Sequence, residues 1–344
     1  MKTIGLEEHF ATSELLKHWA QHTAMPPQLQ RRLTELDDHR LGAMTATGLD
    51  VQVLSVATPG LQDLAPEAAI GLQGTTNDRI ADVVREHRDR FQGFAALATS
   101  APTHAARELQ RAVTELGLNG AMVFPRSGDH SLDESQFWPI FDAASALNAP
   151  LYLHPQEPVT GVSSAYYRGF GDIIDSAFAT FGVGWHYDAG VQVLRLILAG
   201  VFDTFPNLQV ILGHWGEMVL FYLDRIDNLA AAAKLSRPIS DYFRTNVYVT
   251  PGGVLSSATC AGHWRCSAPS GSCSPPTTHT GSSATAAPAN SSTTPTSATA
   301  TGSPSRRATG TGCARESGAD PHGHRDLPVG AVPAGPYPSA RLQG

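Results

Sequence analysis

The stretch Thr3-Ile4-Gly5-Leu6-Glu7-Glu8-His9-Phe10 begins with apolar residues typical of a strand and ends in two carboxylates and an imidazole. Successive side chains of a strand point to opposite faces, so we expect Glu7 and His9 on one face and Glu8 on the other. A carboxylate and an imidazole together at a strand's end suit a divalent metal ion. Charged clusters are also common on solvated sheet edges, so this stretch indicates a metal site only together with the rest of the chain.

Six further apolar runs resemble the first one, and most are followed by helical patterns. The runs lie at 51–56, 91–97, 120–124, 150–154, 208–214 and 246–250, and the helical patterns lie at 66–87, 103–116, 134–147, 191–202 and 216–234. Strand alternating with helix predicts parallel strands joined by right-handed crossovers. No glycine-rich dinucleotide motif follows the first strand. The pattern therefore favours an α/β fold of the (β/α)₈ barrel type, one strand short, over an open doubly wound sheet.

Polar side chains stand where several of these runs end. His154 closes the run at 150–154, and His214 closes the run at 208–214. The carboxyl ends of the strands meet at one face of a parallel barrel, where such proteins carry their chemistry. A lone histidine at a strand end is more often a hydrogen-bonded loop residue. Three histidines and a glutamate at matching ends of three strands instead indicate a metal-centred site.

The composition argues against several classes of partner. The chain has 344 residues, 42% of them hydrophobic, and a formal charge of −7. No Lys/Arg cluster could follow a phosphate backbone, so nucleic acid is not an expected partner. No apolar run approaches the ~20 residues of a membrane span, and the N-terminus lacks a signal-peptide pattern. We therefore expect no membrane association and a cytoplasmic location.

Five motifs resemble those of the amidohydrolase-related family. They are LEEHF at 6–10, YLHP at 152–155, GVFD at 200–203, ILGHWGE at 211–217 and DRID at 224–227. The similarity is greatest to the non-oxidative decarboxylases of hydroxybenzoates, such as the γ-resorcylate and 2,3-dihydroxybenzoate decarboxylases, and it extends from the N-terminus to about Gly253. It implies a TIM barrel of the metal-dependent hydrolase type and a small aromatic carboxylic acid as substrate.

The resemblance also implies a metal-ligand set. Glu7, His9 and His154 would hold a divalent ion, Zn²⁺ or Mn²⁺, with an aspartate after the eighth strand as the fourth protein ligand. His214 and Glu217 would form a polar pair beside the substrate. The members of this family commonly form homo-oligomers, so the resemblance implies a homo-oligomer for an intact chain.

Arg225 resembles an arginine that meets the substrate or its surroundings in the family. The alternative for this side chain is a salt bridge to Asp224 or Asp227. Three aromatic residues, Trp19, Phe170 and Trp185, lie in stretches that could contact a substrate ring, although aromatic side chains in such stretches more often serve packing.

Two reactions are compatible with this family. A hydroxybenzoate could chelate the metal through its carboxylate and an ortho hydroxyl, and protonation of the ring carbon would then release CO₂. A hydrolase of an amide or a lactone would instead add water on the same scaffold. In the family the aspartate after the eighth strand serves as the acid of the first reaction and the base of the second.

That aspartate is missing from this sequence. After the run at 246–250 no aspartate occurs until Asp320, and between Arg244 and Arg306 the only charged side chain is Arg265. Ala, Ser, Thr, Pro and Gly dominate from 256 onward, which predicts a disordered, low-complexity segment. All four cysteines lie there, and the spacing of these cysteines and the nearby histidines matches no standard zinc pattern. We therefore divide the chain into a truncated barrel at 1–255 and a low-complexity tail at 256–344.

A shift of reading frame accounts for the tail. Codons that begin at the third base of each written codon allow LRWALEVLGA across 259–269, LFSTDYP across 270–279 and HGNW across 308–312. These strings supply, in family order, a helix, the eighth strand with its aspartate, and a C-terminal motif. We therefore expect the chain to have lost the strand and helices that complete the barrel, and its activity to be impaired. An inactive remnant without bound metal is the third alternative, besides the decarboxylase and the hydrolase.

Overall fold

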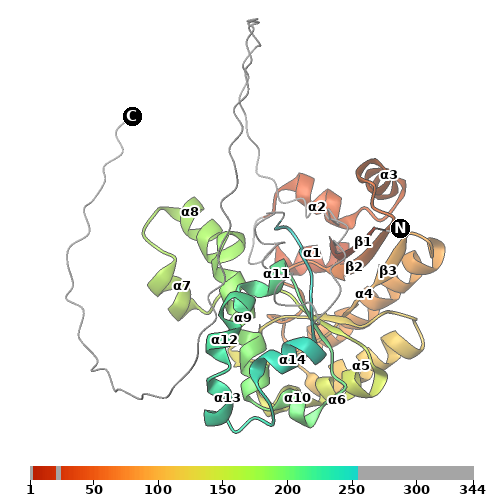
Figure 1. Cartoon of the computed structure of the whole chain (residues 1–344). Helices are drawn as coiled ribbons and strands as arrows, with labels where there is room; N and C mark the ends of the chain where they lie inside the picture. The colour runs from red at the N-terminus through yellow and green to blue at the C-terminus, as the bar shows by residue number, and fades with distance from the viewer. Residues whose placement is uncertain (1–2, 21–24, 255–344) are drawn as a thin grey trace, which may run out of the picture. The chain divides into compact units, whose positions relative to one another are not determined.

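A computed structural model describes residues 3–20 and 25–254, all within one compact unit. Strands that lie parallel and in sequence order form the wall of a barrel (Figure 1). They are β1 (Ile4–Phe10), β2 (Val51–Val56), β3 (Phe91–Gly93) with β4 (Ala95–Ala96), β5 (Ala121–Val123), β8 (Leu151–Leu153), β9 (Val210–Leu212) and β10 (Val247–Val249). The pairing of each strand with the next agrees with the predicted α/β barrel.

The third predicted strand is divided into β3 and β4, because its first part pairs with β2 and its second part pairs with β5. The Phe94 N–H donates to the Leu54 carbonyl at 2.8 Å, whereas the Ala95 N–H donates to the Gly120 carbonyl at 2.8 Å. The wall is therefore continuous across Phe94. A small antiparallel hairpin of β6 (Arg126–Ser127) and β7 (His130–Ser131) follows β5.

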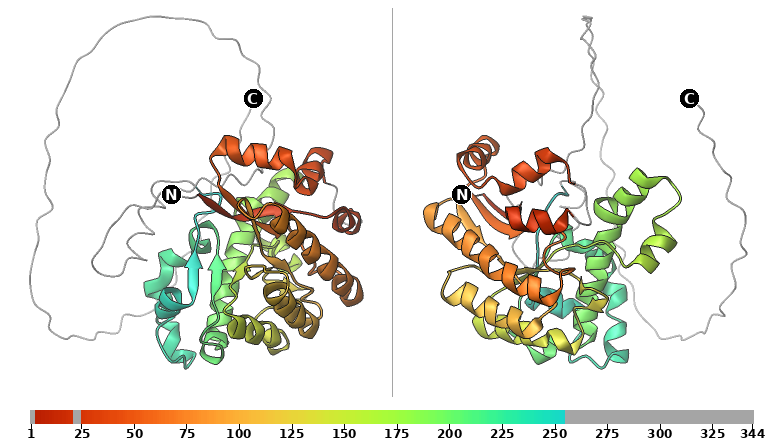
Figure 2. Two further views of the ribbon diagram at one scale, coloured as in Figure 1. Left: turned by 90° about the vertical axis from the view of Figure 1, so that its right-hand side faces the viewer. Right: turned by 180° about the vertical axis from the view of Figure 1, so that it is seen from behind.

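Helices cover the outside of this wall (Figure 2). They are α4 (Pro66–Glu86), α5 (Pro102–Thr114), η1 (Ser135–Phe137) with α6 (Trp138–Leu147), α9 (Gly184–Leu198), α10 (Val201–Thr204) and α14 (Ile239–Thr245). The β1–β2 connection holds α1 (Ser13–Trp19), α2 (Pro27–Thr34) and α3 (Asp38–Thr47), and the β8–α9 connection holds α7 (Thr160–Tyr166), α8 (Asp172–Ala177) and η2 (Phe178–Gly182). The helices α7 and α8 stand apart from those that cover the wall (Figures 1 and 2).

Two of the predicted helices differ from the structure. The one predicted at 191–202 begins earlier, at Gly184, and ends at Leu198, because Gly200 has a φ of 75° and reverses the chain before α10. The one predicted at 216–234 is wrong. The chain there begins with a left-handed turn, α11 (His214–Glu217). Three short helical segments follow it, and they are η3 (Val219–Tyr222), α12 (Leu223–Ile226) and α13 (Leu229–Ala232).

Buried side chains form two groups, one inside the barrel and one between the wall and its helices. The inner group takes one inward-facing residue from most strands, and it includes Val53, Met122, Tyr152 and Ile211. The outer group is larger and packs the other face of the strands against the helices. Alternation of the strand side chains produces both groups at once.

Within the part of the chain that the structure describes, the barrel wall is open between β1 and β10. Strand β1 pairs only with β2 there, and β10 pairs only with β9. Ile4 on β1 is 41% exposed and Tyr248 on β10 is 61% exposed, as expected of strands at a free edge. The eighth strand, the tail at 256–344 and the proposed shift of frame lie outside the described residues.

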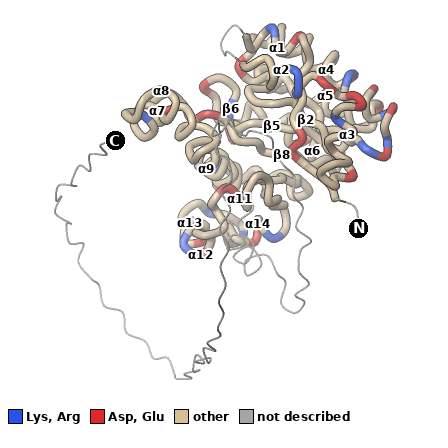
Figure 3. The backbone as a smooth tube through the Cα atoms, turned by 90° about the horizontal axis from the view of Figure 1, so that it is seen from above, with Lys and Arg blue, Asp and Glu red and all other residues tan. Residues whose placement is uncertain are grey.

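Basic and acidic residues alternate along the backbone around α3, α4 and α5 (Figure 3). Among residues 3–20 and 25–254, no helix combines the length and the apolar character needed to cross a membrane.

Candidate metal centre

Glu7, His9 and His154 bring three ligand atoms together at the carboxyl ends of β1 and β8. The Glu7 Oε1 atom lies 2.9 Å from His154 Nε2 and 3.5 Å from His9 Nε2, and the two imidazole nitrogens are 3.1 Å apart. Ligands about 2.1 Å from an ion at tetrahedral or octahedral angles lie about 3.0–3.4 Å apart, so these separations match one face of a coordination polyhedron. The donor set of one carboxylate and two imidazoles fits Zn²⁺ or Mn²⁺.

Neighbouring polar groups orient the three ligands. The Tyr152 hydroxyl donates to Glu7 Oε2 at 2.6 Å, which leaves Oε1 for the cluster. His154 donates from Nδ1 to the Pro155 carbonyl at 2.7 Å, and because a carbonyl only accepts, the proton of a neutral His154 lies on Nδ1. Its Nε2 therefore carries a lone pair that points at a carboxylate oxygen. A cation between the two would relieve this contact.

Burial and charge act on these groups in opposite directions. Burial raises the pKa of Glu7, but His154, His9 and His214 outweigh it and hold that pKa well below its usual value. Burial lowers the pKa of His154, although Glu7 opposes the shift. An ionised carboxylate and a neutral imidazole are the forms that bind metal.

Glu8 lies on the opposite face of β1, as the alternation of side chains predicts. Its Oε2 accepts from Gln52 Nε2 at 2.8 Å, and Arg40 Nε donates to Gln52 Oε1 at 2.7 Å. Burial raises the pKa of Glu8 to about 7, although Arg40 opposes the shift. This carboxyl group therefore belongs to the packing between β1 and α3 and not to the cluster.

A second polar cluster lies beside the first and is built on a left-handed turn. The five residues from His214 to Met218 all have φ between 46° and 80°. This conformation is costly for residues other than glycine and occurs mainly where surrounding structure enforces it. Here it places His214 Nδ1 2.7 Å from Glu217 Oε1, while His214 Nε2 lies 3.9 Å from Glu7 Oε2.

His186 completes this second cluster. Its Nδ1 lies 2.7 Å from Glu217 Oε2, so both oxygens of a fully buried carboxylate face imidazole nitrogens. No sequence pattern points to His186, because this residue lies in the first turn of α9 and not at a strand end. The neighbouring Trp185 stands out in the sequence only as an aromatic residue, and nothing in the local sequence marks His186 as a partner of Glu217.

Burial lowers the pKa of His214, but the hydrogen bond and the charge of Glu217 outweigh this effect and raise it above its usual value. Burial raises the pKa of Glu217, but His186 and His214 hold it below its usual value. Both shifts favour the form of the pair in which Glu217 is ionised and His214 is protonated.

The profile of the amidohydrolase family matches residues 9–265 of this sequence. This chain belongs to the amidohydrolase family. It is 36% identical over 271 residues to a gamma-resorcylate decarboxylase of Polaromonas sp. (strain JS666), an alignment that covers 74% of this chain and 81% of that protein.

Solved structures of other proteins share its fold. The 5-carboxyvanillate decarboxylase of Sphingomonas paucimobilis superposes with a TM-score of 0.71 at 30% identity, over 77% of this amidohydrolase and 85% of that chain. A dihydroxybenzoic acid decarboxylase of Polaromonas sp. JS666, solved with manganese and the inhibitor 2-nitroresorcinol, superposes with a TM-score of 0.68 at 33% identity, over 77% and 82%. The barrel class predicted from the sequence is confirmed.

The remaining residues singled out in the sequence lie in different surroundings. In this amidohydrolase Arg225 is exposed on α12, and no salt bridge joins it to Asp224 or Asp227. It lines an apolar hollow of about 400 Å³ between α9 and the η3–α13 segment, which Glu217 also reaches. A catalytic role for Arg225 stays a prediction.

The three aromatic residues named from the sequence, Trp19, Phe170 and Trp185, also lie in different parts of the fold. The Trp185 ring lies 6.3 Å from the His154 ring, next to the metal cluster. Trp19 is buried and donates its indole N–H to the Gly60 carbonyl at 2.9 Å, whereas Phe170 is 61% exposed. Of the three, Trp185 is the residue that the fold brings to the cluster.

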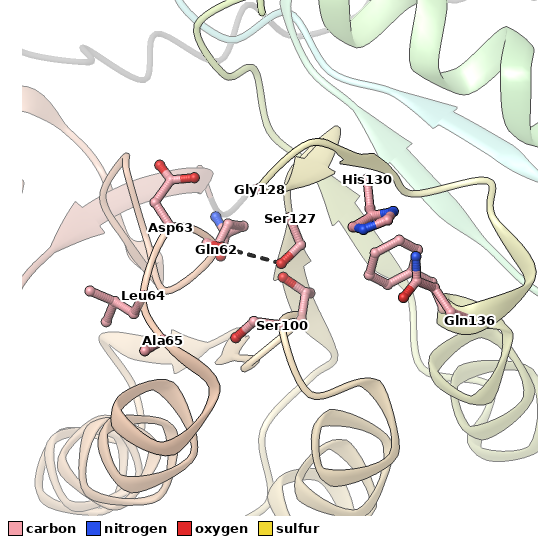
Figure 4. A pocket seen from close by; sticks show the side chains of 11 residues that line it. Gln62, Asp63, Leu64, Ala65, Ser100, Ser127, Gly128, His130 and Gln136 are labelled. Carbon is pink, nitrogen blue, oxygen red and sulfur yellow. Dashed lines mark hydrogen bonds between the residues drawn. The ribbon is translucent and has the colours of Figure 1, made fainter.

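A separate polar hollow of about 290 Å³ lies between the loops that follow β2 and β4 and the β6–β7 hairpin (Figure 4). Ser127 donates from its hydroxyl to the Gln62 carbonyl there at 3.2 Å. Ser100, His130 and Gln136 also line it, and none of its lining residues belongs to either polar cluster. The hollow is therefore distinct from the candidate metal centre.

Proposed function

We propose that this amidohydrolase is a metal-dependent, non-oxidative decarboxylase of a hydroxybenzoate-like aromatic acid. The observation that supports the proposal is the placement of Glu7, His9 and His154, which could hold a metal ion, beside His214, with Glu7 Oε2 3.9 Å from His214 Nε2. The names of the relatives, which are decarboxylases of dihydroxybenzoates and a carboxyvanillate, support this substrate class.

Glu7, His9 and His154 would hold the ion. When bound, it supplies positive charge that anchors the carboxylate and hydroxyl oxygens of the substrate and stabilises negative charge on them. Either Zn²⁺ or Mn²⁺ suits the donor set, and the manganese in a related structure favours Mn²⁺. In its protonated form His214 would carry a proton at Nε2, on the side that faces Glu7.

The reaction needs one proton and releases one molecule of CO₂. Because this sequence lacks the aspartate that serves as the acid in the family, His214 would be the donor in its place. Transfer of a proton from His214 Nε2 to the ring carbon that bears the carboxylate makes this carbon tetrahedral. The bond to the carboxylate then breaks, and its electron pair returns to the ring. Glu217 stays ionised and stabilises His214 in its charged form before the transfer. The Trp185 ring lies edge-on to the His154 ring on this side.

We further propose that residues 1–255 are a truncated barrel and that 256–344 arise from a shifted reading frame. The composition of the tail supports this division, as do the motifs of its third-base frame. The described residues contribute three protein ligands to the cluster, and the fourth would come from the lost strand. The proposal therefore includes a low activity for this chain.

Two measurements test the proposed function. Metal analysis of the purified chain should give close to one Zn²⁺ or Mn²⁺, and a Glu7→Gln variant should lose it. Release of CO₂ from 2,6- or 2,3-dihydroxybenzoate should be detectable above the same assay with the Glu7→Gln variant. A chain with no bound metal and no turnover would be the inactive remnant. Addition of water to a cyclic amide or a lactone, without CO₂ release, would indicate the hydrolase.

Two further properties belong to this proposal. A cytoplasmic location is proposed from the sequence and from the family. A homo-oligomer is supported by exposed apolar side chains beside the hollow at α9, among them Val191, Tyr222 and Leu229. Light scattering during size-exclusion chromatography would decide between a monomer and an oligomer.

A further inference from the structure

Each carboxylate oxygen of Glu217 lies within hydrogen-bond distance of one imidazole. His214 Nδ1 lies 2.7 Å from Oε1, and His186 Nδ1 lies 2.7 Å from Oε2. The carboxylate has no exposed surface, and the two imidazole rings meet edge-on at 4.4 Å. Such a group of three could either hold a second metal ion or act as a hydrogen-bonded unit.

The tautomer of His186 decides between these alternatives. The indole N–H of Trp185 lies 2.9 Å from His186 Nε2, and an indole nitrogen only donates. His186 Nε2 must therefore accept, and the proton of the neutral ring lies on Nδ1. The Phe181 carbonyl lies 3.2 Å from the same Nε2, but a proton there would oppose the closer indole N–H. With its proton on Nδ1, His186 has no lone pair for an ion at Glu217, and the contact is a hydrogen bond.

The hydrogen bond between His186 and Glu217 also affects His214. A carboxylate held at one oxygen by His186 cannot rotate, so its other oxygen stays directed at His214 Nδ1. That oxygen accepts the Nδ1 proton of His214, and His214 Nε2 is left facing Glu7 at 3.9 Å. Three hydrogen bonds thus connect Trp185 to His186, His186 to Glu217, and Glu217 to His214. The direction of each bond follows from which of its two atoms can donate a proton.

We propose that His186 is a positioning residue, which fixes the Glu217 carboxylate and thereby sets the tautomer and orientation of His214. This inference rests on the proposed function, because it concerns the residue that supplies the proton. The inference goes beyond the proposed function because it assigns a role to a helix residue that lies outside the group of Glu7, His9 and His154.

Removal of the His186 donor has two expected effects. The buried Oε2 atom would lose its partner, which is costly, so Glu217 would rotate toward other donors. His214 would then no longer be restricted to one tautomer. Asparagine at this position places an amide N–H where Nδ1 of histidine lies, so it should restore the bond that leucine removes.

The test uses the full-length chain labelled with ¹⁵N-histidine and studied by NMR at a pH where imidazoles are neutral. Any metal added is Zn²⁺, because Mn²⁺ is paramagnetic. The ¹⁵N shifts of His214, assigned by its absence in a His214→Gln variant, distinguish the Nδ1–H from the Nε2–H tautomer. The wild-type chain should show Nδ1–H, His186→Leu should show a mixture, and His186→Asn should return to Nδ1–H. His39→Leu, a matched change at a side chain that is 78% exposed, should leave the pattern unchanged.

A second variant addresses the chance that His186→Leu does not fold. Trp185→Phe keeps an aromatic ring at this position but removes the indole N–H that donates to His186 Nε2, so the ¹⁵N shifts of His186 itself should move toward a mixture of tautomers. An unchanged His214 pattern in a folded His186→Leu chain would overturn the proposal, and so would an unchanged His186 pattern in Trp185→Phe.

Kinetics provide an independent readout. The kcat for decarboxylation should fall about tenfold in His186→Leu and recover in His186→Asn, with KM changed less than about twofold, as expected for a residue that acts through another. A wild-type chain without turnover would contradict the proposed function and leave the NMR result standing as the test of positioning. A loss of kcat in both variants would show that the hydrogen bond is not what matters and would overturn the inference.

Discussion

Glu7 and Glu8 are adjacent in the sequence, yet their carboxyl groups meet opposite surroundings. Glu7 faces imidazoles, which keep it ionised, and Glu8 faces the packing under α3, which raises its pKa to about 7. The alternation of a strand separates the two groups, and a bulge between Gly5 and Glu8 sets their register against β2. A Cβ at Gly5 would lie 2.3 Å from Glu8 Oε1, so a larger residue there would require the Glu8 side chain to move.

Glu8 should make the stability of the fold depend on pH. Burial raises its pKa in the folded chain from the ordinary 4.5 to about 7, so ionisation opposes folding. The free energy of unfolding should therefore fall as pH rises from about 4.5 to about 7. Glu8→Gln should remove this loss and stabilise the fold at pH 8 by as much as about 3 kcal/mol.

Urea unfolding at pH 5 and pH 8 measures this effect. The exposed Glu115→Gln is the control, and it should change the midpoint little at either pH. Equal midpoint shifts for Glu8→Gln at the two pH values would contradict the prediction.

Tyr152 should contribute to metal affinity without touching the ion. Its hydroxyl donates to Glu7 Oε2 at 2.6 Å, so Tyr152→Phe would leave this carboxylate free to turn. We expect Zn²⁺ affinity to fall about 10–100-fold, measured by competition with a chelator. Tyr248→Phe, at a side chain that is 61% exposed, should bind Zn²⁺ like the wild type. An unchanged affinity in Tyr152→Phe would mean that the hydroxyl does not orient Glu7.

Among the elements, the left-handed turn at α11 depends on the helix behind it. Gly190 of α9 packs so closely that a Cβ there would lie 2.6 Å from the Glu217 carbonyl oxygen. The Trp215 N–H donates to the Thr250 carbonyl at 2.8 Å, which fixes the turn to the end of β10. Contacts from two distant segments thus hold a backbone that is unfavourable by itself.

Gly190→Ala should disturb the second cluster through this contact. The obstructing atom belongs to the backbone, so the turn itself must shift, and we expect a loss of about 1–3 kcal/mol in the free energy of unfolding. The His214 ¹⁵N pattern should change as well. Gly71→Ala in α4 is the matched control, because its Cβ would meet no atom within 4 Å. That variant should be neutral or slightly stabilising. Retention of both stability and the His214 pattern in Gly190→Ala would contradict the role given to this contact.

For the whole molecule, the open side between β1 and β10 is the weak point of the described fold. A barrel has no free edges only when it closes, and here Ile4 and Tyr248 remain exposed at the two edges. Net stabilities of domains are about 5–15 kcal/mol, so the proposed truncation, which removes one strand and its covering helices, would take away a large part of the total.

Restoration of the third-base reading frame should therefore stabilise the protein and improve metal binding. We expect a higher melting temperature, tighter Zn²⁺ binding and a larger yield of soluble protein than for the chain as written. Calorimetry and resequencing of the DNA near 255–259 test this. A sharp cooperative melt of the written chain with protease resistance beyond Leu255, or an intact frame without family motifs, would contradict the hypothesis.

The sequence by itself determined the barrel strands and the positions of Glu7, His9, His154 and His214. Strand alternation and the meeting of parallel strands at one face are local rules, and local rules can be read along a chain. Glu217 followed from the family resemblance, and the structure places it beside His214 at the same end of the barrel.

Only the tertiary structure decided the rest of the site. His186 reaches Glu217 from the first turn of a helix, across a separation of 31 residues, and no spacing rule connects the two. The break of the predicted helix at 216–234 likewise depends on Gly190 and Thr250, which lie outside it. Backbone conformations that are unfavourable locally are stabilised by distant packing, and a sequence read in short windows does not contain that packing.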